Sequence, residues 1–374
     1  MRTVMHVAQA PGGVERYLYT LLKYIDKSEY NNILVLSQNY DIQKFKNLAT
    51  KIEIVEMYRE IGFLKEIKAV FNIRKLIKKY HPDVVYIHSS KAGVVARIAN
   101  LGFKNKCIYN AHGWAFNMKI SKSKKKIYTL IEKMLSPLCT NIICISDYEK
   151  ESAIKEGICR IDKLKVIYNG IDFEEHRTQS GLTRTNLGIP EEAFVVGSVG
   201  RLDRQKAPDI FVKAAKKIKE KIPNTFFVMV GNGNEQEEIV KQINEYGLSE
   251  SFLITGWVNN PLDYIRCFDV AMLLSRWEGF GLVLPEYMLE GKPIIATKVD
   301  AIPNIITDGI NGLLVDMDDY SAAANAVEKI YTSNIGRTLI ENGKKGVYER
   351  FNAQRLAKET EALIEQMYRA KKEL

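Results

Sequence analysis

Two glutamates in the last third of the chain have the spacing of a ligand-gripping pair. Glu278 and Glu286 are separated by seven residues in Glu-Gly-Phe-Gly-Leu-Val-Leu-Pro-Glu, which follows the apolar run 270–274. On a turn followed by a helix, one acid lies at the mouth of the helix and the other about two turns in. That distance is too long for a close pair acting on one bond. We therefore expect the acids to hold the two ends of an elongated ligand rather than to lie in the core.

The residues between the acids predict an anion site. Gly279, Phe280 and Gly281 precede the expected helix. The first backbone N–H groups of a helix have no partner within it, and the helix dipole attracts negative charge there. This segment is the strongest functional signal in the chain.

A basic loop follows an expected strand at 194–199. Its sequence is Gly-Arg-Leu-Asp-Arg-Gln-Lys, from Gly200 to Lys206. The planar fork of Arg201 and the point charge of Lys206 together suit a diphosphate, although a solvated basic loop has the same composition. Because ligands of parallel sheets bind beyond the carboxyl ends of the strands, the position favours the diphosphate.

Two segments of the first half also follow expected strand ends. Gly12 and Gly13 lie in Pro-Gly-Gly-Val-Glu-Arg, which ends at Arg16 and opens a helix; the glycines allow backbone to approach a phosphate or sugar, as a plain tight turn also would. The segment lacks the Gly-x-Gly-x-x-Gly spacing of a dinucleotide site, which argues against a nicotinamide enzyme. His112 lies in Ala-His-Gly-Trp, and structural and catalytic roles are both open for it.

Metal-ligand patterns are few. The run 316–319, Asp-Met-Asp-Asp, contains an Asp-x-Asp, but it precedes an alanine-rich helix, where acids cap the helix and favour its dipole. The five cysteines form no Cys-x-x-Cys pair, which is typical of reduced core thiols. We predict no essential metal and no cofactor.

The order of the expected elements predicts an α/β fold. Short β-branched runs alternate with amphipathic helical stretches up to residue 172, and the pattern restarts at Phe194. This alternation indicates two doubly wound parallel-sheet domains facing across a cleft. We place the domains at 1–172 and 173–354, with a final helix at 355–374 that packs back on one of them, the N-terminal domain being our expectation. The expected strands are 3–7, 32–36, 52–55, 84–87, 107–110, 141–145, 194–199, 225–230, 252–255, 270–274 and 293–296, and the expected helices include 14–24, 63–79, 92–101 and 207–221.

The charge is unevenly distributed. Residues 1–170 hold 29 Lys and Arg against 15 Asp and Glu, a net charge of +14, whereas the remainder has a net charge of −5. The stretch 119–135 mixes lysines with apolar residues, which favours an anionic lipid surface but also describes a solvated helix face. No apolar stretch approaches the ~18 residues of a membrane span. The start of the chain has too short an apolar core for a signal peptide.

With these segments in place, the chain resembles the retaining, nucleotide-sugar-dependent glycosyltransferases of the GT-B fold, family four (group 1). The likeness is greatest to bacterial members that assemble capsule, exopolysaccharide or O-antigen. It runs nearly end to end, and the order and spacing of the pieces are specific. The pieces are the Gly12-Gly13 turn, 88–93 (His-Ser-Ser-Lys-Ala-Gly), 111–113, 145–146, 166–172, 200–206, 231–233, 255–258 and the Glu-x7-Glu segment.

The resemblance implies roles for individual residues. Arg201 and Lys206 would hold the donor diphosphate and stabilise the charge that grows as it leaves, which is electrostatic transition-state stabilisation. Glu278 would contact the transferred sugar, Glu286 the ribose, and His112 the donor sugar near the reacting centre. The other implied contacts are Gly279, Phe280 and Gly281 (sugar and phosphates), Gly13 (phosphates), Val258 and Gly233 (nucleobase) and Gly12, Arg16, Ser89 and Lys91 (acceptor side). Tyr287 departs from the family, since many members carry alanine there.

The implied activity is transfer of a hexose from a nucleotide sugar, with UDP-sugar favoured, to a lipid-linked saccharide without a metal. We expect a cytoplasmic enzyme at the inner face of the cell membrane, held to anionic lipid by its basic N-terminal domain. A sugar-nucleotide epimerase or hydrolase on the same fold is one alternative, and a two-lobed sugar-binding protein without catalysis is another. Nucleic-acid binding is not predicted, because the chain shows no recognisable module for it.

Overall fold

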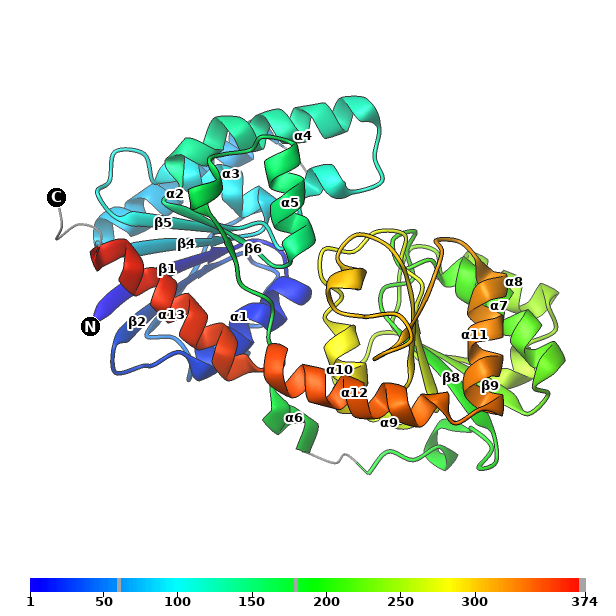
Figure 1. The fold of residues 1–374 in the computed structure, drawn as a ribbon. Coiled ribbons are helices and arrows are strands. Elements are labelled where there is room, and N and C mark those ends of the chain that lie inside the picture. The colour runs from blue at the N-terminus through cyan, green and yellow to red at the C-terminus, as the bar shows by residue number, and fades with distance from the viewer. Residues whose placement is uncertain (59–61, 178–180, 370–374) are drawn as a thin grey trace. The chain divides into compact units, whose positions relative to one another are not determined.

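The computed structural model describes residues 1–58, 62–177 and 181–369. The chain forms two compact units (Figure 1): Met1–Gly170 together with Asn352–Leu374, and Ile171–Phe351. The domain limits expected from the sequence, after residues 172 and 354, lie close to these two crossings. The first unit is therefore built from both ends of the chain, and the second is one continuous stretch.

The first unit contains a seven-stranded sheet in the order β3-β2-β1-β4-β5-β6-β7. Every neighbouring pair is parallel. All of the carboxyl ends therefore lie at one edge, where ligands of such sheets bind. The strands are β1 (Arg2–Ala8), β2 (Tyr30–Leu36), β3 (Lys51–Ile54), β4 (Val84–His88), β5 (Lys106–Asn110), β6 (Asn141–Cys144) and β7 (Leu164–Val166).

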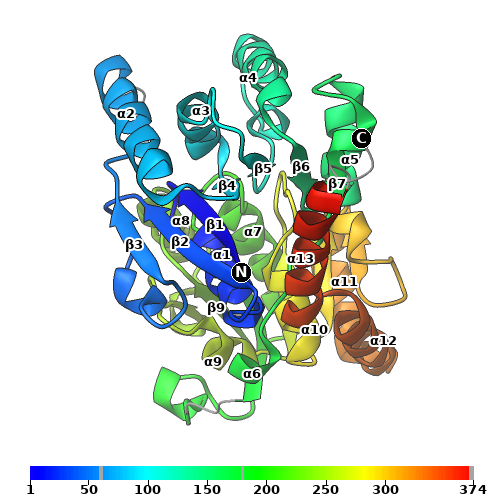
Figure 2. The same cartoon turned by 90° about the vertical axis from the view of Figure 1, so that its left-hand side faces the viewer.

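Helices cover both faces of this sheet. One core joins β1, β2 and β4 to α2 (Phe63–Tyr80), α3 (Ser90–Ala99) and α5 (Asp147–Lys155). The opposite core joins the other side of the same strands to α1 (Gly13–Tyr24) and α13 (Ala353–Arg369). Figure 2 shows α2, α3 and α4 (Lys122–Leu135) in a row, with α1 and α13 on the other side of the strands. The last helix thus supplies core side chains to the unit that begins the chain.

The second unit repeats this plan with six parallel strands in the order β10-β9-β8-β11-β12-β13. One core packs α7 (Pro208–Lys221), α8 (Gln236–Glu245) and α11 (Tyr320–Thr332) on the sheet. Elsewhere α9 (Pro261–Arg266) contacts β8, and α10 (Val283–Leu289) contacts β12 and α12 (Ile335–Arg350). The strands are β8 (Phe194–Val199), β9 (Thr225–Val230), β10 (Phe252–Ile254), β11 (Val270–Leu273), β12 (Ile294–Thr297) and β13 (Leu313–Val315); α6 (Phe173–Arg177) precedes them.

The predicted fold class, two parallel-sheet Rossmann-like domains, is confirmed. The expected strands agree with the observed ones to within two residues, because each is a compact apolar run between turn residues. The sequence analysis missed β7, β13, α5, α6, α8, α9 and α12. The two strands have three residues each, and α5 carries mostly polar side chains with little apolar periodicity. In α8, Ile239 and Ile243 do lie on one buried face, but the rest of the helix is mostly polar.

Candidate active site

The basic loop of the second unit turns directly after β8. The Arg201 guanidinium lies 3.0 Å from Asp203 Oδ2 and donates a 3.0 Å hydrogen bond to Gln205 Oε1. Its side chain is 58 % exposed, so these contacts orient the cation without removing it from solvent. It is therefore accessible to an anionic ligand.

An ion pair joins this loop to the segment after β11. Lys206 Nζ lies 2.5 Å from Glu278 Oε2, and the Ser275 hydroxyl donates to the same oxygen over 3.2 Å. The Glu278 backbone N–H donates to Asp300 Oδ2 at 3.0 Å, which fixes the turn. Two residues predicted separately from the sequence therefore meet, 72 positions apart.

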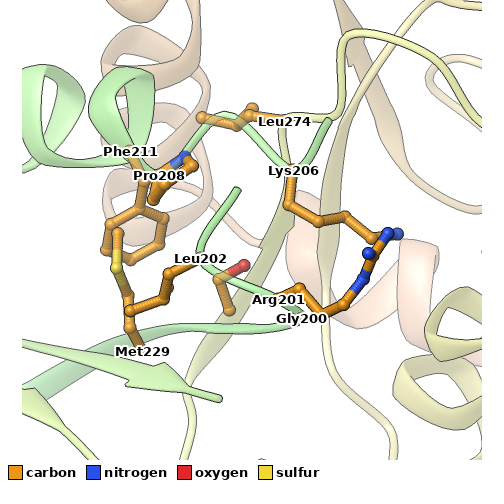
Figure 3. A pocket seen from close by; sticks show the side chains of 9 residues that line it. Gly200, Arg201, Leu202, Lys206, Pro208, Phe211, Met229 and Leu274 are labelled. Atoms are coloured by element: carbon orange, nitrogen blue, oxygen red, sulfur yellow. The ribbon is translucent and has the colours of Figure 1, made fainter. Parts of the chain in front are cut away.

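A small cavity lies beside this pair (Figure 3). It is about 10 Å³, room for about one water molecule. Arg201 and Lys206 extend in the same direction in this view, away from the apolar side chains that line the other side. The lining residues are Ser198, Gly200, Arg201, Leu202, Lys206, Pro208, Phe211, Met229 and Leu274.

Residues of the segment after β11 hold this basic loop in shape. The Arg276 backbone N–H donates to Gln205 O at 2.8 Å, and Gln205 Nε2 donates to Trp277 O at 3.1 Å. The Arg276 guanidinium donates to Asp209 Oδ2 and to Asp318 Oδ1, both at 2.7 Å. These bonds connect the loops after β8 and β11 independently of Lys206.

The Asp-x-Asp run has structural partners. Asp318 pairs with Arg276, and the Asp319 carboxylate accepts from the Ala322 backbone N–H at 2.8 Å as the N-cap of α11. The predicted capping role is confirmed for Asp319. In the described parts of the chain, no three His, Cys, Asp or Glu side chains form a group that could hold a metal ion.

Backbone packs on backbone between the loops after β8 and β9. A Cβ placed on Gly233 would lie 2.2 Å from Leu202 O, and one on Gly231 would lie 2.1 Å from Gly200 O. Only glycine fits at these two positions. Val258, expected near a nucleobase, is partly exposed in the loop between β10 and α9.

The second glutamate corrects one expectation. Glu286 lies in the first turn of α10, not two turns in, because the helix begins only at Val283. Glu278 is 8 % exposed and Glu286 2 % exposed, which runs against the expectation that neither acid would be buried. The partners of Glu278 are polar, and ligand oxygens can replace them. The contact of Glu286 with a ribose stays a prediction.

The glycine segment between the acids turns tightly. Gly281 has φ +80°, and a Cβ there would lie 3.3 Å from Glu278 Cγ. The Phe280 ring is buried and packs edge-on against Phe351 at 5.7 Å, so its side chain does not face solvent, and a ligand contact through its backbone stays a prediction. Tyr287, next to Glu286, is also buried, and its hydroxyl accepts from the Val199 backbone N–H at 2.8 Å.

The first unit carries the remaining predicted residues at the carboxyl edge of its sheet. Gly12 (φ +89°) is the N-cap of α1, and Gly13 and Arg16 form its first turn. Ser89 (φ +81°) is the buried N-cap of α3, and Lys91 forms an ion pair with Glu66. The turns after β1 and β4 thus present these residues from neighbouring strands.

His112 is held by its backbone and by its ring. Its φ is +54°, and its N–H donates to Asn110 Oδ1 at 2.9 Å. Its Nε2 lies 3.1 Å from Nδ1 of His88, whose Nε2 is 3.2 Å from Nδ1 of His6. The sequence analysis did not identify His6 or the link to His88. The available signal was that His6 lies on an expected buried strand and His88 directly follows another, where an ionisable side chain needs a partner.

Within the second unit, then, the structure brings Lys206 to Glu278 and the Gly233 turn to the Arg201 loop. It does not place Arg201 in contact with Glu278 or Glu286. The predicted residues of the first unit form a separate group around the ends of β1, β4 and β5.

Comparisons with known proteins agree with this architecture. Residues 181–366 match the family described as Glycosyl transferases group 1, and residues 11–175 match Glycosyltransferase Family 4. The chain is 28 % identical over 359 residues to an Escherichia coli protein named UDP-Gal:alpha-D-GlcNAc-diphosphoundecaprenol alpha-1,3-galactosyltransferase, covering 93 % of each. It is 31 % identical to an uncharacterized 41.2 kDa protein in the cps region of Klebsiella pneumoniae, over 88 % of this chain and 89 % of that one.

Among solved structures, the fold is similar to that of HepE from Anabaena in complex with UDP and glucose. The TM-score is 0.85, with 22 % identity, over 98 % of this chain and all of the other. At this level of identity the likeness concerns the fold.

Proposed function

Since this chain belongs to the group 1, family 4 glycosyltransferases and has their GT-B fold, we propose that it transfers a hexose from a UDP-sugar to a lipid-linked saccharide with retention of configuration. The name of the Escherichia coli relative supports both substrates, since it gives a UDP-sugar donor and a diphosphoundecaprenol-linked acceptor. The position of the Klebsiella relative in a cps region supports a role in the assembly of a cell-surface polysaccharide.

The observation that carries the proposal is the pairing of Lys206 with Glu278 beside the exposed Arg201. Without donor, Glu278 neutralises the lysine. A bound diphosphate would take its place as the partner of the ammonium and of the guanidinium. The Glu278 carboxylate would then accept hydrogen bonds from hydroxyls of the transferred sugar.

In the proposed reaction, the bond between the anomeric carbon and the diphosphate oxygen breaks while an acceptor hydroxyl approaches the same face. The acceptor oxygen bonds to the anomeric carbon, and its proton passes to the leaving diphosphate. Negative charge grows on the diphosphate as the bond breaks. Arg201 and Lys206 are fixed in advance where this charge develops, which is the arrangement that stabilises a transition state. These two cations would stabilise the negative charge of the leaving diphosphate, as a metal ion could, so we propose that the reaction needs no metal ion.

The test replaces Arg201 and Lys206 with alanine and measures UDP release from a panel of UDP-sugars with a diphospholipid-linked acceptor. We expect loss of turnover in both variants with the fold retained. Arg337→Ala, which removes an exposed arginine from α12 of the same unit, should act as wild type. Unchanged turnover in the Arg201 and Lys206 variants would refute these assignments, and UDP release that needs no acceptor would indicate a hydrolase instead.

We further propose that the first unit docks on the inner face of the cell membrane. In the described part of the chain no helix is long and apolar enough to cross a bilayer. Two helices nevertheless carry exposed apolar side chains at i, i+3 and i+7, which is one helical face. They are Leu64, Ile67 and Phe71 on α2, and Ile127, Leu130 and Met134 on α4.

Lysines accompany both stripes. Lys65 and Lys68 lie beside the first, and Lys126 and Lys133 beside the second. Apolar side chains flanked by lysines suit the boundary between anionic headgroups and acyl chains. Because α2 and α4 lie on the same side of the sheet (Figure 2), one bilayer surface can take both stripes.

Vesicle binding tests the docking surface. Sedimentation with anionic vesicles should weaken in Phe71→Ser and in Leu130→Ser/Met134→Ser, and it should weaken with added salt. Val240→Ser, which removes an exposed apolar side chain from α8 of the second unit, should bind as wild type. Equal binding to neutral and anionic vesicles would contradict the proposal.

A further inference from the structure

Three of the five histidines of this protein form one hydrogen-bonded chain inside the first unit. The chain begins at Asn32, whose Oδ1 lies 3.1 Å from His6 Nε2. It continues from His6 Nδ1 to His88 Nε2 at 3.2 Å and from His88 Nδ1 to His112 Nε2 at 3.1 Å. The three histidine side chains thus connect the interior of the sheet to the loop after β5.

The strand pattern fixes the chain in place. Asn32, His6 and His88 alternate with core residues on the face of the sheet that α1 and α13 cover. All three are buried, with His6 and His88 fully so. The His88 ring stacks near those of His6 and His112, with centroids 5.5 and 5.3 Å apart. The rings have little freedom to rotate out of the chain.

The asparagine determines which atom donates and which accepts along this series of hydrogen bonds. Its amide group Nδ2 donates to the carbonyl oxygen of Tyr30 at 3.4 Å, and a carbonyl oxygen can only accept. The amide oxygen of Asn32 therefore faces His6, and Nε2 of His6 must carry the proton of that bond. If the amide were flipped, the amide oxygen of Asn32 would face the carbonyl oxygen of Tyr30, and neither atom could donate.

The tautomer of each ring then fixes that of the next ring, because a neutral imidazole has one N–H and one lone pair. With its proton on Nε2, His6 accepts at Nδ1 from His88. His88 therefore carries its proton on Nε2 and accepts at Nδ1 from His112. His112 donates from Nε2, so its Nδ1 is left with a lone pair and no proton.

The surroundings keep the rings neutral. Burial lowers the pKa of His6 to about 4 and that of His112 to about 3. Burial and the two neighbouring histidines hold the pKa of His88 well below its ordinary value. Among the described residues Nδ1 of His112 makes no hydrogen bond, and the side chain is partly exposed.

We propose that Asn32, His6 and His88 are positioning residues that fix the tautomer of His112, so that its Nδ1 accepts a hydrogen bond from a hydroxyl of the donor sugar. The contact with the sugar rests on the proposed function, whereas the tautomer does not. The chain makes His112 an acceptor and leaves it no N–H with which to donate to a phosphate. The orientation of the Asn32 amide thereby makes His112 an acceptor for a ligand hydroxyl.

The tautomer can be read without activity. Long-range ¹H–¹⁵N correlation spectra of the ¹⁵N-histidine protein at neutral pH distinguish a protonated from an unprotonated Nδ1, and a His112→Gln sample assigns the signal. We expect His112 with its proton on Nε2. A proton on Nδ1 of His112 in the wild-type protein would overturn the inference, whatever the activity.

Two variants test the source of the direction. Asn32→Leu removes the terminal acceptor, so both tautomers of His112 should become populated. Asn32→Asp is nearly isosteric, and its carboxylate can only accept, so His6 should keep its proton on Nε2 and the His112 tautomer should stay as in the wild type. A His112 that keeps its proton on Nε2 alone in Asn32→Leu would also overturn the inference.

The control is Asn31→Leu, since Asn31 lies on the same strand but its amide donates to Thr3 Oγ1 at 3.3 Å. It should leave the His112 signal unchanged. In the transfer assay we expect Asn32→Leu to raise KM for the donor about fivefold, the effect of losing one hydrogen bond, with a smaller change in kcat. A changed tautomer with unchanged KM would remove the contact with the sugar. Absence of donor turnover in the wild type would refute the proposed function and leave the tautomer result standing.

Discussion

Removing the ammonium of Lys206 should separate its contribution to stability from its contribution to turnover. Lys206→Met keeps most of the side-chain length but leaves the Glu278 carboxylate, whose side chain is 9 % exposed, with the Ser275 hydroxyl as the remaining side-chain donor to Oε2. Breaking one side of a fully buried pair costs about 3–5 kcal/mol. Because the Lys206 side chain is 19 % exposed, water partly replaces the ammonium, and we expect a loss of about 2 kcal/mol.

Two measurements follow this substitution. A loss of about 2 kcal/mol in a unit of this size lowers Tm by about 4–8 °C, which calorimetry resolves. The loss of one preorganised charge at the leaving group should lower kcat by about 10²–10³-fold. The double variant Lys206→Met/Glu278→Gln removes the unpaired charge, so Tm should largely recover while kcat does not.

A surface pair of the same geometry provides the control. Lys221 Nζ also lies 2.5 Å from a glutamate oxygen, that of Glu328, but both side chains are more than a third exposed. Lys221→Met should cost less than about 1 kcal/mol and leave kcat unchanged. A wild-type Tm in Lys206→Met would refute the electrostatic argument for the pair. Recovery of kcat in the double variant would show that Lys206 serves only to neutralise Glu278.

Three other predictions concern single positions. Tyr287→Phe removes the acceptor of the Val199 N–H, so we expect a loss of about 1–2 kcal/mol in unfolding free energy and weaker UDP binding by calorimetry. Gly233→Ala should weaken UDP binding because its Cβ would lie 2.2 Å from the carbonyl oxygen of Leu202. Gly346→Ala in α12 is the control: open space surrounds this position, so the substitution should leave UDP binding unchanged and raise Tm. The folded-state pKa of His6, about 4, lies below the ordinary value of 6.5, so the folded state binds fewer protons. Stability should hold above pH 6.5 and fall between pH 6.5 and 4, with His6 alone contributing about 2 kcal/mol of the loss at pH 5. His6→Gln should reduce that slope in melting curves without abolishing it, because the pKa of His88 and that of His112 are also lowered, and an unchanged slope would contradict the shifted pKa of His6.

Much of the fold could be predicted from the sequence because its signals are local. Each long strand is an apolar run that ends at a glycine or polar turn, so the parallel sheets and the loops at their carboxyl edges could be inferred from order alone. The same local reasoning identified the Arg201 loop and the Glu278 segment. It could not predict that Lys206 and Glu278 form an ion pair, because that contact depends on how two separate loops pack.

The errors have a common physical origin. The start of α10 at Val283 placed Glu286 in the first turn, and its burial depends on how the helix packs on the sheet, which no local pattern reports. The histidine chain depends on the register of β1, β2 and β4, and the pairing of strands distant in sequence fixes that register. Alternation shows that a side chain faces the core, but not which neighbour it meets there.

The return of α13 to the first unit has a consequence for biosynthesis. The second unit enters and leaves through adjacent residues, since the Ile171 N–H donates to Phe351 O at 2.8 Å, so it is an insertion that can fold as soon as it has been synthesised. The first unit cannot complete its core until Leu356 and Ile364 arrive to cover α1. On the ribosome, the half of the protein made first would therefore be the last to finish folding.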